Sequence, residues 1–351
     1  MEPVKMGVIG CGVIGSRNLQ DAQASELIDV VAAADLRVER REWAAEQGVP
    51  RIYEDGRDLL DEDEEVEAVI IAFPAAARTA MALRAFARAR HVLVEKPVAM
   101  NAAEVETMIE AKGNLVAGCF SGRYRAYDSA DVATQFVSAG NLGELRELHI
   151  RALMAAGPRT DRVPPPWRES FCMNAGGILT NWSCYDMDYI LGVAGWSFRP
   201  RMVLAQTWPC AEQFRHHVAP ESDADAHFSA FVRGDAGAVL TVERAEFAAA
   251  ATQQAWQIVG TDGALRLEML ATGEREIIHD EGRGEEGVVS NTLWKGDDRE
   301  GGGNPRLIER FARAVRGDGK PVTTLEQSLV IAQISDAIYQ SAASGEAVEI
   351  L

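Results

Sequence analysis

The sequence predicts an α/β protein in which an N-terminal Rossmann dinucleotide-binding domain is followed by a C-terminal α/β domain with a large, mostly antiparallel open sheet. Short apolar runs alternate with helical patterns over residues 4–120, which is typical of a parallel sheet covered by helices. After about residue 145, longer stretches alternate apolar and polar residues, which is typical of antiparallel strands. We therefore expect two domains, residues 1–120 and 121–351.

Five apolar runs in the first half are too short for helices and have the length of buried strands. They are residues 4–10 (VKMGVIG), 28–35 (IDVVAAAD), 66–73 (VEAVIIAF), 91–97 (HVLVEKP) and 114–120 (NLVAGCF). Helical patterns such as 38–47 and 75–89 lie between them. This alternation predicts a parallel sheet with helices on both faces.

The second half contains the longer alternating stretches, at residues 144–155, 199–208, 225–247 and 255–270. The motifs RGDAG and GTDGA inside two of them favour hairpin turns. The polar, Gly-rich run 280–305 is expected to be a surface loop of low order. Two helical patterns, 305–315 and 325–341, close the chain.

Net charge and cysteine content argue against nucleic-acid binding, membrane binding and a zinc site. The chain has 351 residues, with 35 Lys and Arg against 53 Asp and Glu, so its net charge of −18 disfavours binding to nucleic acid or to an anionic membrane. Five cysteines form no C-x-x-C pair and are not spaced with the six histidines as zinc ligands, so no metal site is predicted. With no secretory or membrane-spanning pattern, we expect a cytoplasmic protein with reduced thiols.

Gly10, Gly12 and Gly15 have the spacing G-x-G-x-x-G directly between the first predicted strand and a helix. The spacing alone is also compatible with a tight structural turn. In this context, however, glycines let the backbone approach a pyrophosphate, and the helix N-terminus supplies N–H donors. The sequence therefore predicts that this loop, including Val13 and Ile14, binds a dinucleotide.

Asp35 closes the second predicted strand, 20 residues after Gly15. A carboxylate at this place would accept hydrogen bonds from the adenosine ribose hydroxyls, and it would repel a 2′-phosphate. Asp35, Leu36 and Arg37 are therefore expected to contact the cofactor, with NAD favoured. Because Arg37 and Arg41 are close in sequence, NADP remains the alternative.

Lys96 lies in the tripeptide E-K-P at the end of the fifth strand, at the sheet edge where open α/β folds bind ligands. By itself, this lysine is also compatible with a solvated side chain. Three features together change the interpretation: G-x-G-x-x-G at the start, E-K-P about 80 residues later, and a Gly-Gly helix start near residue 180. In combination, and over essentially the whole chain, the sequence resembles the Gfo/Idh/MocA family of oxidoreductases.

The resemblance implies hydride transfer at a secondary alcohol or ketone of a sugar or cyclitol, with NAD or NADP as cofactor. Lys96 matches the family's catalytic lysine, which binds and polarises the reacting oxygen, while Glu95 shapes its turn. Phe73 and Pro74 match the loop that passes the nicotinamide ribose. Arg123 matches a family arginine, with either a structural or a substrate-binding role.

Residues 176–188 (GGILTNWSCYDMD) predict a helix in which Asn181, Tyr185 and Asp188 share one face. The family's usual helix has Asp, His and Asp at these places, so this chain departs from the family pattern. The resemblance implies that Tyr185 replaces the histidine as proton relay, which suits reduction of a ketone. Asn181 can orient but cannot titrate, and Asp188 is expected to be structural. The alternative for Tyr185 is a packing role.

The proline-rich segment 157–170 carries Trp167 and Arg168. The resemblance implies that it reaches over the substrate, where an indole face and a guanidinium group suit a sugar ring or an anionic substituent. A solvated loop is the alternative interpretation.

These features predict an NAD(P)-dependent oxidoreductase acting on a sugar, ketosugar or cyclitol. Lys96 would hold the reacting oxygen, Tyr185 would relay the proton and Asn181 would orient one of them. The resemblance also implies a homodimer or homotetramer formed through the C-terminal sheet. Two alternatives remain: a redox-neutral enzyme with retained NAD that acts on a glycoside, and a non-catalytic dinucleotide-binding sensor or scaffold.

Overall fold

The computed structural model describes residues 1–270, 273–298 and 302–350, and its chain divides into two compact units. Unit 1 comprises Met1–Ala126 and Gly301–Leu329, and unit 2 comprises Tyr127–Glu300 and Val330–Leu351. The predicted domain boundary after residue 120 divides the chain linearly, whereas the contacts assign a late segment to unit 1.

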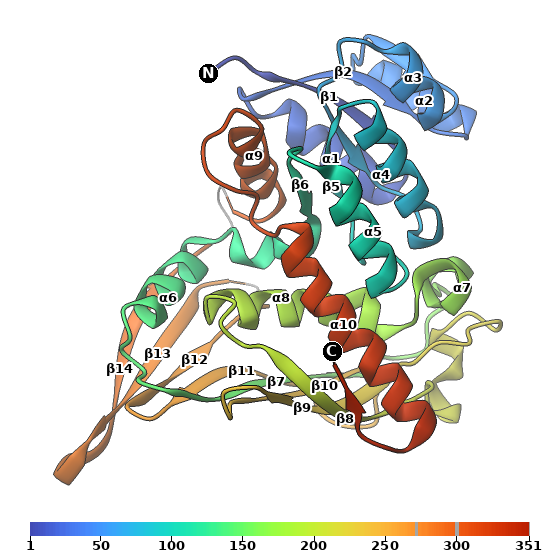
Figure 1. Ribbon diagram of the computed structural model, residues 1–351. Helices are drawn as coiled ribbons and strands as arrows, with labels where there is room; N and C mark the ends of the chain where they lie inside the picture. Colours follow the sequence, from blue (N-terminus) through green and yellow to red (C-terminus); the bar gives the residue numbers. More distant parts are fainter. Residues whose placement is uncertain (271–272, 299–301, 351) are drawn as a thin grey trace. The chain divides into compact units, whose positions relative to one another are not determined.

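Unit 1 is built on a parallel sheet of six strands in the order β3-β2-β1-β4-β5-β6. The strands are β1 (Val4–Ile9), β2 (Ile28–Ala34), β3 (Arg51–Tyr53), β4 (Ala68–Ile71), β5 (His91–Val94) and β6 (Ala117–Cys119). The helices between them are α1 (Val13–Gln23), α2 (Val38–Glu46), α3 (Gly56–Glu62), α4 (Arg78–Ala87) and α5 (Ala102–Lys112) (Figure 1). This strand order confirms the predicted Rossmann fold.

A late helix completes the core of unit 1. Helix α9 (Asn304–Val315) buries Leu307, Ile308 and Phe311 in the same apolar cluster as β1 and α1 residues. Its amphipathic sequence explains this packing, because the three side chains recur on one helical face. The two predicted closing helices are confirmed as α9 and α10 (Leu325–Ser344).

Unit 2 is built on a sheet of nine strands in the order β14-β13-β12-β11-β7-β10-β9-β8-β15. They are β7 (Leu145–Ala155), β8 (Pro200–Trp208), β9 (His227–Gly234), β10 (Val239–Ala248), β11 (Gln253–Gly260), β12 (Gly263–Leu267), β13 (Arg275–Arg283), β14 (Gly287–Gly296) and β15 (Val348–Glu349). Strands β7 and β10 pair in parallel, and the other neighbours pair antiparallel. The predicted mostly antiparallel sheet is confirmed.

Helices cover one face of this sheet (Figure 1). They are α6 (Asp128–Ser138), α8 (Cys184–Val193) and the part of α10 that belongs to unit 2. Every residue of α8 is buried. On the opposite face, β9 alternates buried residues with outward-facing ones such as Ser229 and Phe231. We call the outward-facing side of β7, β8, β9 and β10 the open face.

The prediction of a surface loop at residues 280–305 is wrong for most of that range. Residues 280–296 belong to the hairpin of β13 and β14, joined by a short 3-10 turn at Gly284–Glu286. The polar composition misled the prediction because both faces of this hairpin are largely solvated. Cross-strand polar pairs such as Thr292 with Glu276 (2.6 Å) replace apolar packing. Residues 299–301 of the run lie outside the described residues.

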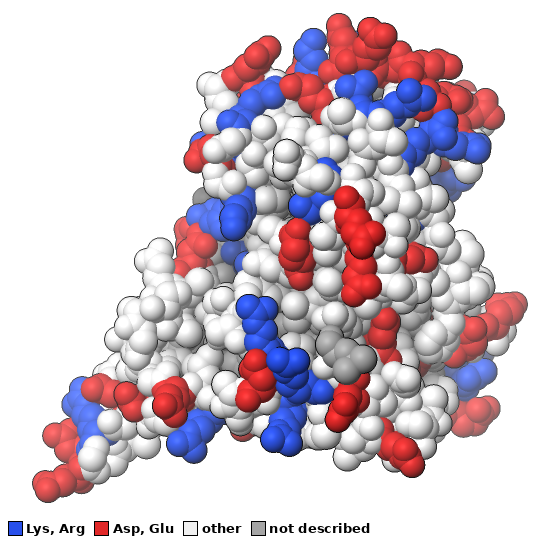
Figure 2. Space-filling view, in the orientation of Figure 1, with Lys and Arg blue, Asp and Glu red and all other residues white. Residues whose placement is uncertain are grey.

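The described surface is strongly acidic in places. Figure 2 shows acidic side chains, interspersed with arginines, over α2 and α3 of unit 1. Within residues 1–270, 273–298 and 302–350, no helix has the length and apolarity needed to cross a membrane. The same residues contain no group of three or more His, Cys, Asp or Glu side chains arranged to hold a metal ion.

Candidate dinucleotide site and candidate catalytic residues

The loop between β1 and α1 needs its glycines for two different reasons. Gly10 has φ +91°, and a Cβ there would lie 2.6 Å from the Ala72 carbonyl oxygen. A Cβ on Gly15 would lie 1.8 Å from the Gly10 carbonyl oxygen, so this glycine lets α1 pack against the turn. Both glycines are therefore required by the protein's own backbone.

Gly12 is different, because a Cβ there would meet only the Arg37 Nη2 atom, at 3.7 Å. The protein therefore leaves open space beside the backbone of Gly12. Such space is expected in a loop that binds an external group close to its backbone. Val13 is 87% exposed and Leu36 is 73% exposed, so apolar surface stands open beside the same loop. Ile14 is partly buried against the core. This arrangement fits a dinucleotide with its phosphates on the loop and its adenine on apolar side chains.

Asp35 follows β2 and is fixed by two backbone donors. Its Oδ2 accepts from Cys11 N (2.7 Å) and its Oδ1 from Arg37 N (2.9 Å), so the carboxylate is held beside the glycine loop. Burial, reinforced by the Asp35 charge, raises the pKa of the Cys11 thiol to about 12. Cys11 therefore stays protonated and serves the loop as a small packing residue.

The two arginines near Asp35 are engaged differently. Arg41 Nη1 donates to the carbonyl oxygens of Asp35 and Leu36, both at 3.0 Å, so it braces the end of β2. The Arg37 side chain is 53% exposed and its Nε lies 3.7 Å from Asp35 Oδ1. Arg37 is thus the more available of the two for a ligand.

Lys96 follows β5 in a turn that is held from inside unit 1. Glu95 is only 3% exposed, and its Oε2 accepts from Lys96 N (3.1 Å). Its Oε1 accepts from Asn18 Nδ2 of α1 (2.9 Å), and Asn18 Oδ1 accepts from Asn304 Nδ2 of α9 (3.1 Å). A buried chain of two amides and one carboxylate thereby connects α1, the lysine turn and α9.

The loop after β4 joins the same edge of the sheet. Arg78 is buried at the start of α4 and donates through Nε to the Phe73 carbonyl oxygen (2.6 Å). Its Nη1 donates to the carbonyl oxygens of Glu95 (3.0 Å) and Pro97. Phe73 and Pro74 are half-buried beside the Gly10 turn. The structure thus brings together the predicted residues of β1, β4 and β5 within unit 1.

The Gly-Gly helix of unit 2 does not begin as the regular helix that the sequence predicts. Residues Leu179–Ser183 form a π-helical turn, and α8 starts only at Cys184. Asn181 therefore lies in the π-helical turn and Tyr185 in α8, so the segment is not one regular α-helix. Asn181 is 7% exposed and Tyr185 is 3% exposed, and Asp188 is fully buried.

Helix α8 is tied to the sheet by an ion pair in the core of unit 2. Arg244 Nη1 of β10 donates to both Asp186 oxygens, at 2.8 and 2.6 Å, and Trp256 Nε1 of β11 donates to the same carboxylate (3.1 Å). The Arg244 guanidinium also lies 4.8 Å from the centre of the Trp182 ring, and Trp182 packs edge to face on Tyr185 (5.6 Å). Tyr185 is thus packed through its ring.

The remaining predicted residues belong to different units. Arg123, in unit 1, donates through Nη2 to Tyr124 Oη (2.9 Å) and lies over that ring. In unit 2, Trp167 is 42% exposed, and Arg168 Nη2 lies 4.0 Å from Glu246 Oε1.

Sequence reasoning missed Asn18 and Asn304, which brace the lysine turn, and Asp186 with Arg244, which anchor α8. Asn18 falls on the core face of α1, and a polar residue at an apolar helical position was the available indication. Asn304 and Arg244 are far from their partners in sequence, so no local pattern identified them.

These features define a dinucleotide-binding protein: a six-stranded Rossmann sheet, an open glycine loop and a second unit with a large sheet. Residues 4–116 match the family model described as an oxidoreductase family with an NAD-binding Rossmann fold, and residues 135–350 match the model for its C-terminal alpha/beta domain. The chain belongs to this family, the Gfo/Idh/MocA oxidoreductases.

Several relatives resemble the chain. Myo-inositol 2-dehydrogenase of Thermotoga maritima is 28% identical over 194 residues, which are 54% of this chain and 55% of that protein. The chain thus spans about half the length of that relative. D-xylose 1-dehydrogenase (NADP(+)) 2 of Haloferax volcanii is 27% identical over 356 residues, 98% of this chain and 99% of that protein.

Among solved structures, levoglucosan dehydrogenase in complex with NADH and L-sorbose has a TM-score of 0.85 and 21% identity, covering 100% of both chains. An oxidoreductase domain protein from Kribbella flavida has a TM-score of 0.85 and 19% identity, also over 100% of both chains. These likenesses show the shared fold.

Proposed function

We propose that the protein transfers a hydride between NAD(P) and a ring carbon of a sugar, ketosugar or cyclitol. One observation carries the proposal: within unit 1, the open Gly12 loop and the internally braced Lys96 turn follow strands of one parallel sheet, at their carboxyl ends. Relatives named for inositol and xylose oxidation support the substrate class.

In this proposal, NAD(P), when bound, supplies or accepts the hydride. The residues proposed to hold the cofactor are Gly10, Gly12, Val13, Ile14, Gly15, Asp35, Leu36, Arg37, Phe73, Pro74 and Glu95. The Lys96 ammonium binds the reacting oxygen and stabilises the negative charge that develops on it. Tyr185 donates its phenolic proton to that oxygen during reduction, and takes it back during oxidation. Asn181 orients the oxygen or the phenol. Arg123, Trp167 and Arg168 are proposed to bind the rest of the substrate.

We propose NAD as the preferred cofactor. Asp35 is held beside the loop by two N–H donors, so it cannot swing away from an incoming 2′-phosphate without losing both bonds. The repulsion would cost on the order of 1–3 kcal/mol, or roughly 5- to 150-fold in affinity. Calorimetric titration should give tighter binding of NADH than NADPH. The reverse order would mean that Arg37 has become the phosphate ligand.

The function is tested by incubating the protein with NAD or NADP and a panel of sugars and cyclitols while absorbance at 340 nm is followed. The matched control is Lys96→Ala, which should bind NADH normally but lower turnover by about 10² or more, a loss of roughly 3 kcal/mol. Conversion of a glycoside without net absorbance change would favour the redox-neutral alternative. Cofactor binding without turnover on any substrate would favour the sensor or scaffold.

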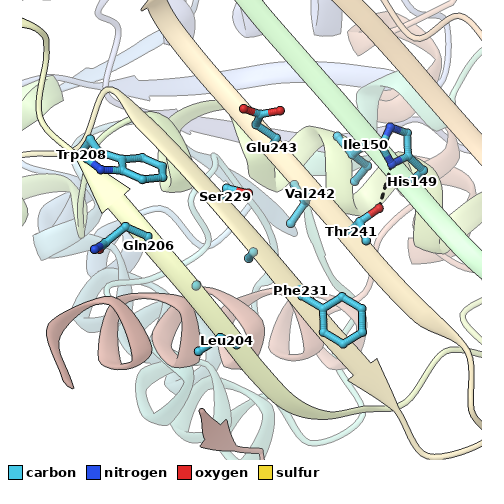
Figure 3. A pocket seen from close by; sticks show the side chains of 12 residues that line it. His149, Ile150, Leu204, Gln206, Trp208, Ser229, Phe231, Thr241, Val242 and Glu243 are labelled. Carbon is cyan, nitrogen blue, oxygen red and sulfur yellow. Dashed lines mark hydrogen bonds between the residues drawn. The ribbon is translucent and has the colours of Figure 1, made fainter. Parts of the chain in front are cut away.

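We also propose that the chain forms a homodimer or homotetramer through the open face. Figure 3 shows side chains of β7, β8, β9 and β10 that line a hollow on this face. Leu204 is 50% exposed, and Trp208 and Phe231 are each 42% exposed, so large apolar groups stand in water there. A second copy related by a two-fold axis would cover them, because such an interface pairs the same surface patch of both subunits and removes its apolar groups from water. The five free cysteines support the predicted cytoplasmic location.

A further inference from the structure

Asp225, which lies just before β9, is a buried carboxylate that binds the beginning of the Gly-Gly helix. Its Oδ1 accepts from Gly177 N (2.9 Å) and its Oδ2 from Leu179 N (3.0 Å). Its carbonyl oxygen accepts from Ile178 N (2.9 Å). Three successive amide groups, which a helix start leaves without partners, are thus satisfied by one residue.

The two glycines are shaped around this contact. A Cβ on Gly177 would lie 1.9 Å from the Asp225 carbonyl oxygen. Gly176 has φ +139°, and a Cβ there would lie 1.9 Å from Tyr339 Oη. The Gly-Gly pair of unit 2 therefore admits Asp225 and Tyr339 to the helix start.

Tyr339 of α10 fixes the carboxylate in turn. Its hydroxyl donates to Asp225 Oδ1 at 2.6 Å, and its ring packs edge to face on Phe171 (5.0 Å). Burial, with the neighbouring Asp225 charge, raises the pKa of Tyr339 well above its usual value. The phenol therefore remains a donor throughout the neutral range, and Asp225 keeps three donors on its two oxygens.

The held segment leads directly into the proposed catalytic side chains. Asn181 N donates to Gly177 O (2.9 Å), and Asn181 lies two residues beyond Leu179, inside the π-helical turn. We propose that Asp225, fixed by Tyr339, is a positioning residue that sets the place of Asn181 and Tyr185. This inference rests on the proposed function of those two side chains. A shift of the helix start would carry both of them with it, and misplacement by about 1 Å can cost roughly 10² in rate.

The decisive variant is Asp225→Asn, which keeps the size of the side chain but turns an NH₂ group toward one of the helix N–H donors. We expect turnover to fall about 10- to 100-fold, with NADH affinity unchanged because the cofactor residues lie in unit 1. Amide hydrogen exchange, followed by mass spectrometry, should accelerate in residues 177–185 and remain unchanged in β1 and α1. Asp235→Asn is the matched control, since it removes the same charge from an exposed carboxylate of unit 2.

Tyr339→Phe provides a graded second variant, because it removes one donor but leaves the amide bonds from Gly177 and Leu179 to the Asp225 carboxylate. It should show a smaller loss of turnover and a smaller acceleration of exchange than Asp225→Asn. If Tyr185 is the proton donor, the limb of the pH–rate profile that its hydroxyl contributes should move in Asp225→Asn, which a loss of stability alone would not cause.

Wild-type turnover and an unmoved pH profile in Asp225→Asn would overturn the inference, whatever happens to exchange. If the wild type neither oxidises nor reduces any sugar or cyclitol tested, the proposed function fails. The hydrogen-exchange measurement then tests the role of Asp225 without an activity assay. Acceleration confined to 177–185 then supports a positioning role for Asp225, and unchanged exchange overturns it.

Discussion

Gly12 and Gly15 lie three residues apart in one loop, yet they are glycine for different reasons. The protein's own backbone requires Gly15, whereas Gly12 is proposed to leave room for the cofactor. Gly15→Ala would drive a methyl group into the Gly10 carbonyl oxygen at 1.8 Å, so we expect a loss of about 1–3 kcal/mol in the free energy of unfolding. Gly12→Ala meets only the end of the Arg37 side chain at 3.7 Å, so the fold should keep its stability while NADH affinity falls. Thermal unfolding and calorimetric titration separate the two effects. Normal NADH affinity in Gly12→Ala would argue against phosphate binding at this loop.

Tyr185 is one of the two residues at which, by the resemblance described above, this chain differs from the usual helix of the family. Tyr185→Phe keeps the ring that packs on Trp182 but removes the hydroxyl, so turnover should fall about 10²-fold or more with little change in stability. The measurement is a pH–rate profile on the sugar that the screen identifies. An unchanged rate and profile would leave Tyr185 as a packing residue, with the proton supplied by Lys96 or water.

Asn181→Asp tests the same departure from the other side. The resemblance implies that the usual carboxylate works with a histidine at the position of Tyr185, so a carboxylate at 181 alone should not produce the usual site. A new carboxylate near the phenol would disfavour phenolate formation. We therefore expect lower activity in Asn181→Asp, measured under the conditions of the Tyr185→Phe profile. Higher activity would show that Asn181 limits proton transfer.

Individual site residues could be predicted from the sequence where their chemistry is encoded by a short local motif. The glycine loop, Asp35 and the E-K-P turn each have a short motif, and the structure brings them to one sheet edge of unit 1. The hydrogen bonds that support these loops have no local motif, because Asn304 and its partner Asn18 are 286 positions apart in the sequence. Such contacts depend on the completed fold, so a single sequence does not reveal them.

At the scale of elements, α8 is the helix whose placement depends on a charge pair in the core. Arg244 is 2% exposed and Asp186 is fully buried. Arg244→Met would leave a carboxylate with one neutral donor, Trp256, and should cost about 3–5 kcal/mol of unfolding free energy. Chemical denaturation measures this loss.

The double variant Arg244→Met with Asp186→Leu removes both charges and should recover much of that stability, because the desolvation penalty disappears with the pair. If the double variant were no more stable than Arg244→Met, the loss would come from packing against Trp182 instead of from the unpaired carboxylate.

The predicted elements failed at two places for different physical reasons. The polar composition of residues 280–296 predicts a loop, but exposed strands such as β13 and β14 need cross-strand pairs more than apolar faces. The sequence predicts a regular helix at Leu179–Ser183, where the structure has a π-helical turn, because helical periodicity does not distinguish the two. In that turn the first amide groups bind Asp225, which the sequence places 46 positions beyond Leu179.

At the scale of the whole molecule, the open face determines the assembly that we expect. Phe231→Glu places a charge amid the exposed apolar groups of β8 and β9 and should shift the protein to a smaller species in light scattering after gel filtration. Val288→Glu is the control: Val288 is 71% exposed, on the β14 hairpin, and should not change the assembly. A wild-type protein that is monomeric at all concentrations tested would contradict the proposed oligomer.

The return of α9 to unit 1 has a consequence for biosynthesis. A ribosome completes the strands of unit 1 by residue 119, but the helix that carries Leu307, Ile308 and Phe311 into their core is made only near the end of the chain. At usual rates of translation, about 190 intervening residues take roughly 10 to 40 s. During that interval the nascent Rossmann sheet lacks the side chains of α9 that cover part of its apolar cluster, and a chaperone can bind the exposed surface. Arrest of translation before α9 should therefore yield chains that are captured by chaperones or aggregate, although every strand of their first sheet has already been synthesised.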